Sequence, residues 1–314
     1  MHHQFIISSM LQSIINKLTP VYPPEEAREI AFWVLEELTG LDRFTLSACK
    51  DTKNISNIEI ILQRIVKKEP IQYIFGHILW FGLDLKLTSA TLIPRPETAE
   101  LVEWVHFSAS EAVFQRSGLS AEGGLSAQRS VIDIGTGSGC IALKLKQLHP
   151  EWQVTGIDIS SEAIAVAKEN ASRHHLDVSF LVQDIFQCNG LSGEAGLSAL
   201  AVCSPQGGLS AEGGLHYDIV VSNPPYVLES EKSSMDSTVL DYEPASALFV
   251  PDSDPLRFYR RIAELRLGTW LYFEINEQKG AAVRDLLASL GYVDIEIKKD
   301  SYGKERMVRA RLAR

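Results

Sequence analysis

From residue 130 onward, short apolar stretches alternate with amphipathic stretches of about ten to fifteen residues. The apolar stretches are typical of buried strands and the amphipathic ones of helices. Strands separated by helices of this length form right-handed βαβ units, which build a parallel sheet. The sequence therefore predicts an α/β domain. Its expected elements are “SVIDIG”, “GCIALKLKQLH”, “WQVTGIDI”, “SSEAIAVAKENASRHH”, “VSFLVQ”, “HYDIVVS”, helices near 254–267 and 278–290, “TWLYFEI”, “VDIEIKK” and “RMVRARLA”.

The first 70 residues have a different pattern, with apolar residues at three- and four-residue spacing that predicts helices. Residues 71–93 then alternate as β-strands do and contain Gly76 and Gly82, which favours a short hairpin. At 314 residues the chain has room for more than one domain. We expect a helical bundle in 1–70, a β-hairpin linker in 71–93 and the α/β domain in 94–314.

Charge and cysteine content limit the partners and the compartment. Forty acidic and thirty basic residues give a formal net charge of -10, which argues against stable, sequence-independent binding of nucleic acid. The four cysteines form no CxxC pair and no cluster with histidines, so we expect no metal site and a reducing cytoplasm. Polar residues interrupt the apolar N-terminal segment, which predicts no signal peptide and no membrane span.

Related glycine-rich words interrupt the alternation of strands and helices. “GLSAEGGLSA” occupies 118–127, “GLSGEAGLSA” occupies 190–199 and “GLSAEGGL” occupies 208–215. Their irregular spacing excludes a solenoid, whose repeats recur at a fixed period. Gly, Ser and Ala favour inserted surface loops without chemistry, and a role in binding a partner is the alternative.

A glycine-rich turn follows the first expected strand of the α/β domain. In “VIDIGTGSGCIAL”, Gly135, Gly137 and Gly139 permit a tight turn and close approach of a ligand to the backbone, including that of Thr136. The dinucleotide fingerprint spaces its glycines as G-x-G-x-x-G, whereas these occupy every second position. This spacing disfavours a nicotinamide oxidoreductase and resembles the S-adenosylmethionine loop of Rossmann-like methyltransferases.

Acidic residues end the next two expected strands. Asp158, about twenty residues past the loop, can accept hydrogen bonds from both hydroxyls of a ribose, with Ile159 beside it. Asp184 can accept the amino group of an adenine while Ile185 packs on the ring. Ligands of open α/β sheets bind at this carboxyl edge. Both aspartates could instead be ordinary helix or loop caps.

The strand “HYDIVVS” ends in “NPPY”, residues 223–226, at the same expected edge. Asn-Pro favours a plain turn, which is the structural alternative. Chemically, Asn223 Oδ1 and the Pro224 carbonyl can each accept one N–H of an amide or exocyclic amino group. That arrangement aims the nitrogen lone pair at a methyl donor, so positioning supplies most of the catalysis. Pro224 and Pro225 restrict the backbone, and Tyr226 offers an apolar wall for a planar group.

At these residues the chain resembles the release factor glutamine methyltransferases, the PrmC/HemK family, along almost its entire length. The shared words are “PIQYIFG”, “IPRPETAELVEWV”, “DIGTGSGCIAL”, “GIDIS”, “VSNPPYV”, “YEPASAL”, “FEI” and “KDSYGKERMV”. The resemblance implies a Rossmann-like, seven-stranded domain whose last strand is antiparallel, preceded by a helical bundle that helps hold the release factor. It implies methylation, with S-adenosylmethionine, of the side-chain amide of the glutamine in the Gly-Gly-Gln loop of peptide-chain release factors.

The resemblance also assigns residues. Asn223, Pro224 and Tyr226 are expected to be catalytic, with Pro225 and Arg95 also binding substrate. The segment from Arg95 to Thr98 is expected to help close the site, Glu97 is a supporting residue or a helix cap, and Glu274 has no assigned role. Ala99 and the segment after “FEI” depart from the common family pattern. The expected cofactor contacts are Gly135, Thr136, Gly137, Gly139, Asp158, Ile159, Asp184, Ile185 and Asn223.

“NPPY” also occurs in enzymes that methylate amino groups of adenine or guanine in nucleic acid, which is the alternative function. The acidic balance and the lack of an evident target-recognition domain weigh against it. A catalytically silent binding protein is a further alternative. It would have no need to keep both the glycine loop and the “NPPY” corner.

Overall fold

The computed structural model describes residues 5–48, 57–110, 128–187 and 216–313. The glycine-rich segments at 118–127, 190–199 and 208–215 lie outside the described residues. The chain divides into two compact units. The first comprises Met1–His77 and Asp236–Tyr242, and the second comprises Ile78–Met235 and Glu243–Arg314.

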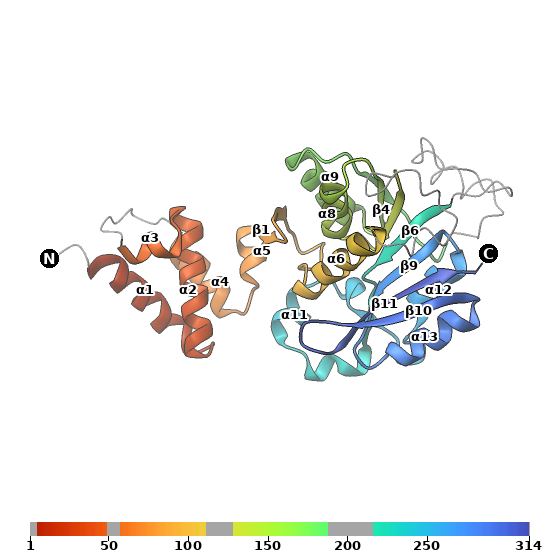
Figure 1. Cartoon of the computed structure of the whole chain (residues 1–314). Helices are drawn as coiled ribbons and strands as arrows, with labels where there is room; N and C mark the ends of the chain where they lie inside the picture. The colour runs from red at the N-terminus through yellow and green to blue at the C-terminus, as the bar shows by residue number, and fades with distance from the viewer. Residues whose placement is uncertain (1–4, 49–56, 111–127, 188–215, 314) are drawn as a thin grey trace. The chain divides into compact units, whose positions relative to one another are not determined.

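The first unit is helical, as the spacing of its apolar residues predicts. Buried Leu18, Val34 and Leu35 belong to its core. Helix α2 has acidic residues in its first turn and ends at Gly40, whose φ is 69° and whose N–H bonds the Glu36 carbonyl. The helices are α1 (Phe5–Leu18), α2 (Pro24–Thr39), α3 (Arg43–Ala48), α4 (Ile58–Val66), α5 (Ile71–Phe75) and α11 (Ser237–Tyr242) (Figure 1).

Two features of this part differ from the sequence pattern. The expected hairpin begins only at residue 77, as β1 (His77–Trp80) and β2 (Leu83–Lys86), because 71–75 form helix α5. Helix α11 belongs to the first unit although it follows the “NPPY” corner, and the Tyr242 hydroxyl donates to the Lys67 carbonyl at 3.0 Å. The division into 1–70, 71–93 and 94–314 stays a prediction.

The second unit contains the predicted α/β sheet. Within the described residues it has seven strands in the order β10-β11-β9-β6-β3-β4-β5. Strand β11 pairs antiparallel with both neighbours, whereas the pairs among the five following strands are parallel. The predicted seven-stranded architecture with an antiparallel last strand is confirmed. The strands are β3 (Ser130–Ile134), β4 (Gln153–Asp158), β5 (Ser179–Val182), β6 (Tyr217–Ser222), β9 (Gly268–Glu274), β10 (Tyr292–Lys299) and β11 (Glu305–Leu312).

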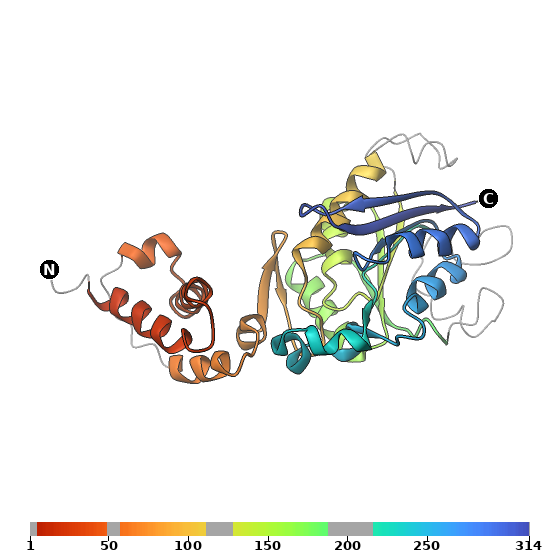
Figure 2. The ribbon, with the colours of Figure 1, turned by 90° about the horizontal axis from the view of Figure 1, so that it is seen from below.

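Helices cover both faces of this sheet (Figures 1 and 2). Successive side chains of a strand point to opposite faces, so Val221 joins one apolar cluster and Val220 the other. Strand β9 is buried along its whole length, as expected for a strand covered on both faces. One face packs against α6 (Pro96–Ser110), α8 (Cys140–Leu148) and α9 (Ser161–Arg173), and the other against α12 (Arg257–Leu265) and α13 (Gly280–Ser289).

Parallel pairing brings the carboxyl ends of β3, β4, β5, β6 and β9 to one edge. Ile134 pairs with Ile157, Asp158 pairs with Val182, and Ser222 pairs with Phe273. The glycine turn, Asp158 and the “NPPY” corner therefore lie at this edge, where open α/β sheets bind ligands. Among the described helices, none is both long and apolar enough to cross a membrane.

Candidate active site

The glycine turn connects β3 to α8, and each of its three glycines has a positive φ: 74° at Gly135, 54° at Gly137 and 84° at Gly139. A Cβ on Gly139 would lie 3.1 Å from the Phe180 ring, so this glycine lets the turn pack closely. A Cβ on Gly135 or Gly137 would meet no atom within 4 Å. Those two glycines thus combine left-handed backbone with open space, which suits close approach of a ligand.

Thr136 holds the turn against its own strand. Its hydroxyl donates to Asp133 Oδ2 at 2.6 Å, and its N–H donates to the Ile157 carbonyl at 3.0 Å. Burial raises the pKa of the Asp133 carboxyl to about 7, against the opposing effect of the Thr136 hydrogen bond. Thr136 is 4% exposed and supports the turn from inside. Its cofactor contact stays a prediction.

Asp158 lies beside the turn at the end of β4. Its Oδ2 accepts the Gly137 N–H at 2.9 Å and its Oδ1 accepts the Ser160 N–H at 2.9 Å. The N-cap of α9 is Ser160, whose hydroxyl accepts the Ala163 N–H, so Asp158 is not that helix cap. Its bond to the Ser160 N–H is, however, the local contact that the loop-cap alternative predicts. Each carboxylate oxygen has a second lone pair, so the fixed Asp158 retains capacity for ribose hydroxyls.

The expected adenine contacts differ in character. Ile159 is 62% exposed, which leaves an apolar surface at the sheet edge. Asp184 Oδ1 accepts the Phe186 N–H at 2.8 Å, the local turn contact that the capping alternative predicts. Ile185 is buried, and its carbonyl accepts a hydrogen bond from Arg261 Nε at 2.8 Å. The turn at 184–186 is therefore held by a hydrogen bond within it and by one from Arg261.

The “NPPY” corner is attached to the glycine turn through Ser222. The buried Ser222 hydroxyl donates to the Ile134 carbonyl at 2.6 Å, joining the last residues of β6 and β3. Beyond the corner, β7 (Val227–Leu228) pairs with β8 (Phe249–Val250). Asn223 is thus placed next to the turn by the sheet itself, and the chain after Tyr226 is held by a second, short sheet.

A hydrogen-bonded group lies behind the corner. Asn223 Nδ2 donates to Thr98 Oγ1 at 3.2 Å, and the Thr98 hydroxyl donates to Glu274 Oε2 at 2.7 Å. The Tyr226 hydroxyl donates to Glu274 Oε1 at 3.1 Å. Burial raises the pKa of the Glu274 carboxyl, while the hydrogen bonds from Thr98 and Tyr226 oppose the rise. The corner is therefore more than a turn: two of its side chains are bonded into the domain core.

Comparison with known proteins agrees with this geometry. A methyltransferase-domain family model matches residues 125–195. A release factor glutamine methyltransferase from Bacteroides thetaiotaomicron is 39% identical over 310 residues, covering 95% of this chain and 97% of the relative. The chain belongs to the release factor glutamine methyltransferase family. A second member, from Flavobacterium psychrophilum, is 35% identical and covers 97% of this chain and 98% of its own length.

The family resemblance predicted from the sequence is confirmed by these relatives. Among solved structures, the N-terminal domain of human METTL16 in complex with SAH is similar with a TM-score of 0.50 and 16% identity. The match covers 82% of this chain and 85% of that one. At this identity the likeness shows the fold alone, a Rossmann-like methyltransferase fold, as the sequence predicts.

Two sequence motifs of the family, “RPET” and “YEPASAL”, are joined by an ion pair. Arg95 lies 2.5 Å from Glu243, whose other oxygen accepts the Ile93 N–H at 3.2 Å. The Glu243 side chain is buried, whereas the Arg95 side chain is 34% exposed. Arg95 thus fixes the segment before α6, and its contact with substrate stays a prediction. Glu97 lies in the first turn of α6, where a negative carboxylate interacts favourably with the helix dipole.

Glu274 is the site residue that sequence reasoning missed. The signal was present, because Glu274 ends a strand at the same carboxyl edge as Asp158 and Asn223. Thr98 was expected only as part of a closing segment. Its hydroxyl joins Asn223 to Glu274 inside the domain, and the closing role of the segment stays a prediction.

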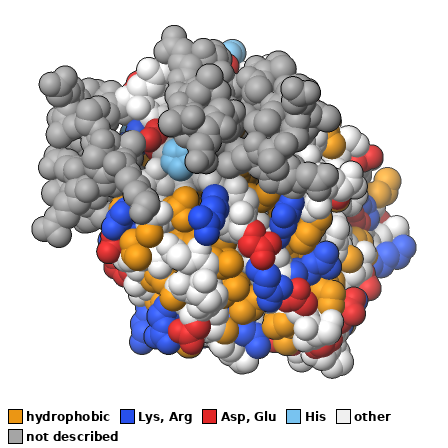
Figure 3. All heavy atoms as spheres, turned by 90° about the vertical axis from the view of Figure 1, so that its right-hand side faces the viewer, with side chains coloured by type: hydrophobic (Ala, Val, Ile, Leu, Met, Phe, Trp, Pro, Cys, Tyr) orange, Lys and Arg blue, Asp and Glu red, His pale blue; other side chains and the backbone are white. Residues whose placement is uncertain are grey.

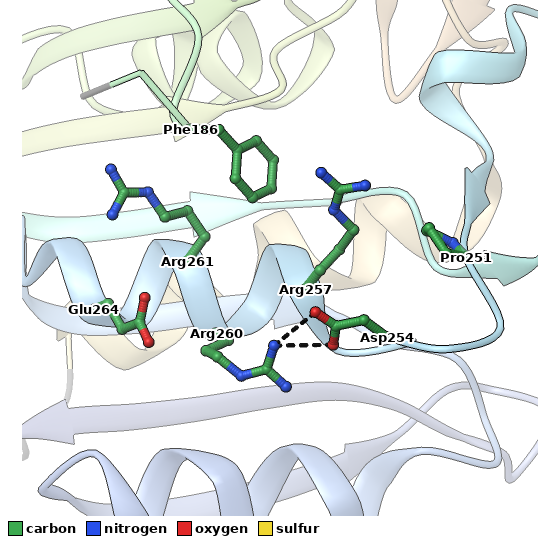
Figure 4. A pocket seen from close by; sticks show the side chains of 7 residues that line it. All are labelled: Phe186, Pro251, Asp254, Arg257, Arg260, Arg261 and Glu264. Carbon is green, nitrogen blue, oxygen red and sulfur yellow. Dashed lines mark hydrogen bonds and ion pairs between the residues drawn. The ribbon is translucent and has the colours of Figure 1, made fainter. Parts of the chain in front are cut away.

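A separate cavity of about 290 Å³ lies along α12 (Figure 4). Arg260 pairs there with Asp254 at 2.8 Å, and the Arg257 guanidinium lies 4.6 Å from the centre of the Phe186 ring. None of its lining residues is an expected site residue, so this cavity is distinct from the glycine turn and the corner. It is lined by Phe186, Pro251, Asp254, Arg257, Arg260, Arg261 and Glu264.

Basic and acidic side chains are interspersed on the described part of the face shown in Figure 3. They do not gather there into one continuous basic surface. Phosphate backbones are gripped by clustered Lys and Arg. This face therefore offers no evident track for nucleic acid among its described residues.

Proposed function

We propose that this protein transfers a methyl group from S-adenosylmethionine to the side-chain amide nitrogen of the glutamine in the Gly-Gly-Gln motif of peptide-chain release factors. The observation that carries the proposal is full-length similarity to release factor glutamine methyltransferases. The sheet edge supports the proposal, because the Ser222 hydrogen bond to the Ile134 carbonyl joins the strand before the “NPPY” corner to the strand before the glycine turn.

The residues present fit S-adenosylmethionine. Gly135 and Gly137 leave open space above a left-handed turn, and Asp158 is fixed beside them by the Gly137 N–H. We assign Asp158 to the ribose, Ile159 and Ile185 to the adenine faces, and Asp184 to the adenine amino group. S-adenosylmethionine supplies a methyl group on a positively charged sulfur, which makes that carbon electrophilic.

The protein residues act on the substrate amide. Asn223 Oδ1 and the Pro224 carbonyl each accept one N–H, which turns the nitrogen lone pair toward the methyl carbon. The bound cofactor would supply the methyl group and retain the electrons of the broken C–S bond, and the nitrogen held by Asn223 and Pro224 would release one of its two N–H protons to solvent as the product leaves. Tyr226 and Pro225 pack against the glutamine and exclude water. Most of the rate acceleration comes from positioning.

We also propose a division of labour between the parts of the chain. Residues 1–70 form the bundle that helps hold the release factor, 71–93 connect, and 94–314 carry out methyl transfer. Arg95 contributes to the substrate side of the site. The reaction takes place in the cytoplasm, where release factors act on the ribosome.

The test is transfer of labelled methyl groups by the full chain to purified release factor, with DNA and ribosomal RNA assayed in parallel. We expect label on the release factor only, and no label when the Gly-Gly-Gln glutamine is replaced by alanine. Label on nucleic acid without label on the release factor would identify a base amino methyltransferase and refute the proposal.

A further inference from the structure

The hydrogen bonds of the buried group behind the corner have fixed donor and acceptor roles. Glu274 is 1% exposed and Thr98 is 2% exposed, so neither faces solvent. A hydroxyl carries a single proton, and that of Thr98 is donated to Glu274 Oε2 at 2.7 Å. The Thr98 oxygen can therefore only accept from Asn223, whose Nδ2 lies 3.2 Å away.

This pattern of donors and acceptors fixes which end of the Asn223 amide meets the substrate. With the NH2 group turned toward Thr98, Oδ1 lies on the opposite side of the Cβ–Cγ bond and points away from Thr98. Oδ1 is the acceptor that the proposed reaction requires. A flipped amide would present donors to a substrate that itself offers donors, and both sets of N–H groups would be left unpaired.

The same carboxylate also fixes the second side chain of the corner. Glu274 Oε1 accepts the Tyr226 hydroxyl at 3.1 Å, while Oε2 accepts Thr98. One buried residue at the end of β9 thus orients Asn223 indirectly and Tyr226 directly. These two residues flank the prolines whose backbone carries the other proposed acceptor.

We infer that Thr98 and Glu274 are positioning residues, which set the amide orientation of Asn223 and so present Oδ1 to the substrate nitrogen. The inference rests on the proposed function for its catalytic consequence. Its geometric content, the orientation of the Asn223 amide, can be tested without any reaction.

The geometric test compares Thr98→Val, which keeps the shape and removes the hydroxyl, with Thr98→Ser, which keeps the hydroxyl. The side-chain amide NMR signals of Asn223 are identified as those missing in Asn223→Ala. We expect Thr98→Val to shift them and to speed their hydrogen exchange at least about tenfold, as loss of a buried hydrogen bond would do. Thr98→Ser should retain slow exchange. Unchanged signals in Thr98→Val would overturn the inference whatever the enzyme methylates.

The catalytic test uses the same variants on release factor. We expect Thr98→Val to lower kcat by about 10- to 100-fold with KM little changed, because alignment rather than binding is lost. Thr98→Ser should recover most of the activity. Added to Asn223→Ala, Thr98→Val should cause no further loss, since it acts through Asn223. Independent, multiplying losses would mean that Thr98 is only a structural residue and would contradict the inference.

The two tests separate the possible failures. Wild-type protein that never methylates release factor would refute the proposed function, while the NMR comparison would still decide the inference. Active wild-type protein with fully active Thr98→Val would refute the inference alone. Thermal unfolding of every variant identifies any loss of activity that comes from misfolding. Tyr226→Phe removes the hydrogen bond to Glu274 and tests that second contact in a chain that keeps Thr98.

Discussion

Asn223 has little freedom although it lies at a corner of the chain. Its backbone follows the buried Ser222, which bonds to β3, and its side chain bonds to Thr98, 125 residues away in the sequence. A residue held from both sides can present an acceptor without being reorganised during the reaction. Such preorganisation is the main source of catalysis where little charge remains to be stabilised.

Asn223→Ala should therefore lower turnover by roughly 10² to 10³, the order found when one preorganised group is removed. Binding of S-adenosylmethionine, measured by calorimetry, should change little, because the glycine turn, Asp158 and Asp184 keep the other expected cofactor contacts. Asn276→Ala is the control, because Asn276 follows β9 at the same edge and its side-chain oxygen accepts the Gln278 N–H of a local turn. Near-normal turnover of Asn223→Ala would show that the amide need not be held in this way.

At the scale of elements, the turn between β3 and α8 is decided by packing as well as by backbone angle. Gly139 and Gly303 have similar φ values of 84° and 81°. A Cβ on Gly139 would meet Phe180 at 3.1 Å and both Ala167 and Leu143 at 3.2 Å, whereas a Cβ on Gly303 would meet nothing within 4 Å. Substitution of Gly303 would therefore strain the backbone alone, whereas substitution of Gly139 would also crowd the core.

Gly303→Ala should cost about 1 kcal/mol of unfolding free energy, from the positive φ alone. Gly139→Ala should cost about 2 to 4 kcal/mol, because overpacking adds to the strain. Urea unfolding of both variants measures the difference. Equal costs would mean that the neighbours of Gly139 move aside freely.

Helices α6 and α8 meet at a pair of histidines. His106 Nδ1 lies 3.0 Å from His149 Nε2, and the His149 ring stacks on Trp152 at 3.6 Å. Burial lowers the pKa of His149 to about 4, with a further lowering from His106. The folded chain thus holds His149 neutral, whereas the unfolded chain protonates it near its ordinary value of about 6.5.

Stability should therefore fall as the pH drops from about 6.5 to about 4, by up to about 3 kcal/mol from this residue. Above a pH of about 6.5, His149 should have no effect on the pH dependence of stability. His149→Gln should flatten the fall in a series of urea unfolding curves. His175→Asn is the control, since His175 is exposed and asparagine tolerates its φ of 53°. An unchanged slope in His149→Gln would exclude His149 as the source.

At the scale of the whole molecule, the chain crosses between its units more often than the sequence suggests. Helix α11 follows the “NPPY” corner and ends at the first residue of “YEPASAL”, but it belongs to the first unit. Its Tyr242 bonds Lys67, and the next residue, Glu243, pairs with Arg95 in the second unit. The chain therefore passes from the second unit into the first at Asp236 and returns to the second unit at Glu243.

Deleting residues 119–127 should leave methyl transfer to release factor near the wild-type level. The deleted word is rich in Gly, Ser and Ala and carries none of the proposed site residues. Long loops between elements contribute little to stability, so shortening one costs little. Activity and thermal midpoint are measured together. A large loss of activity at an unchanged midpoint would show that this word takes part in binding a partner.

The sequence by itself determined the alternation of strands and helices, the glycine turn, Asp158 and the corner at one sheet edge. These follow from local periodicity and from the rule that parallel strands end together. Only the tertiary structure decided that Asp184 bonds its own turn, that 71–75 are helical, and that Glu274 reaches Thr98 across 176 residues of sequence. The bond between Thr98 and Glu274 leaves no periodic trace in a single chain, because it depends on how the elements pack.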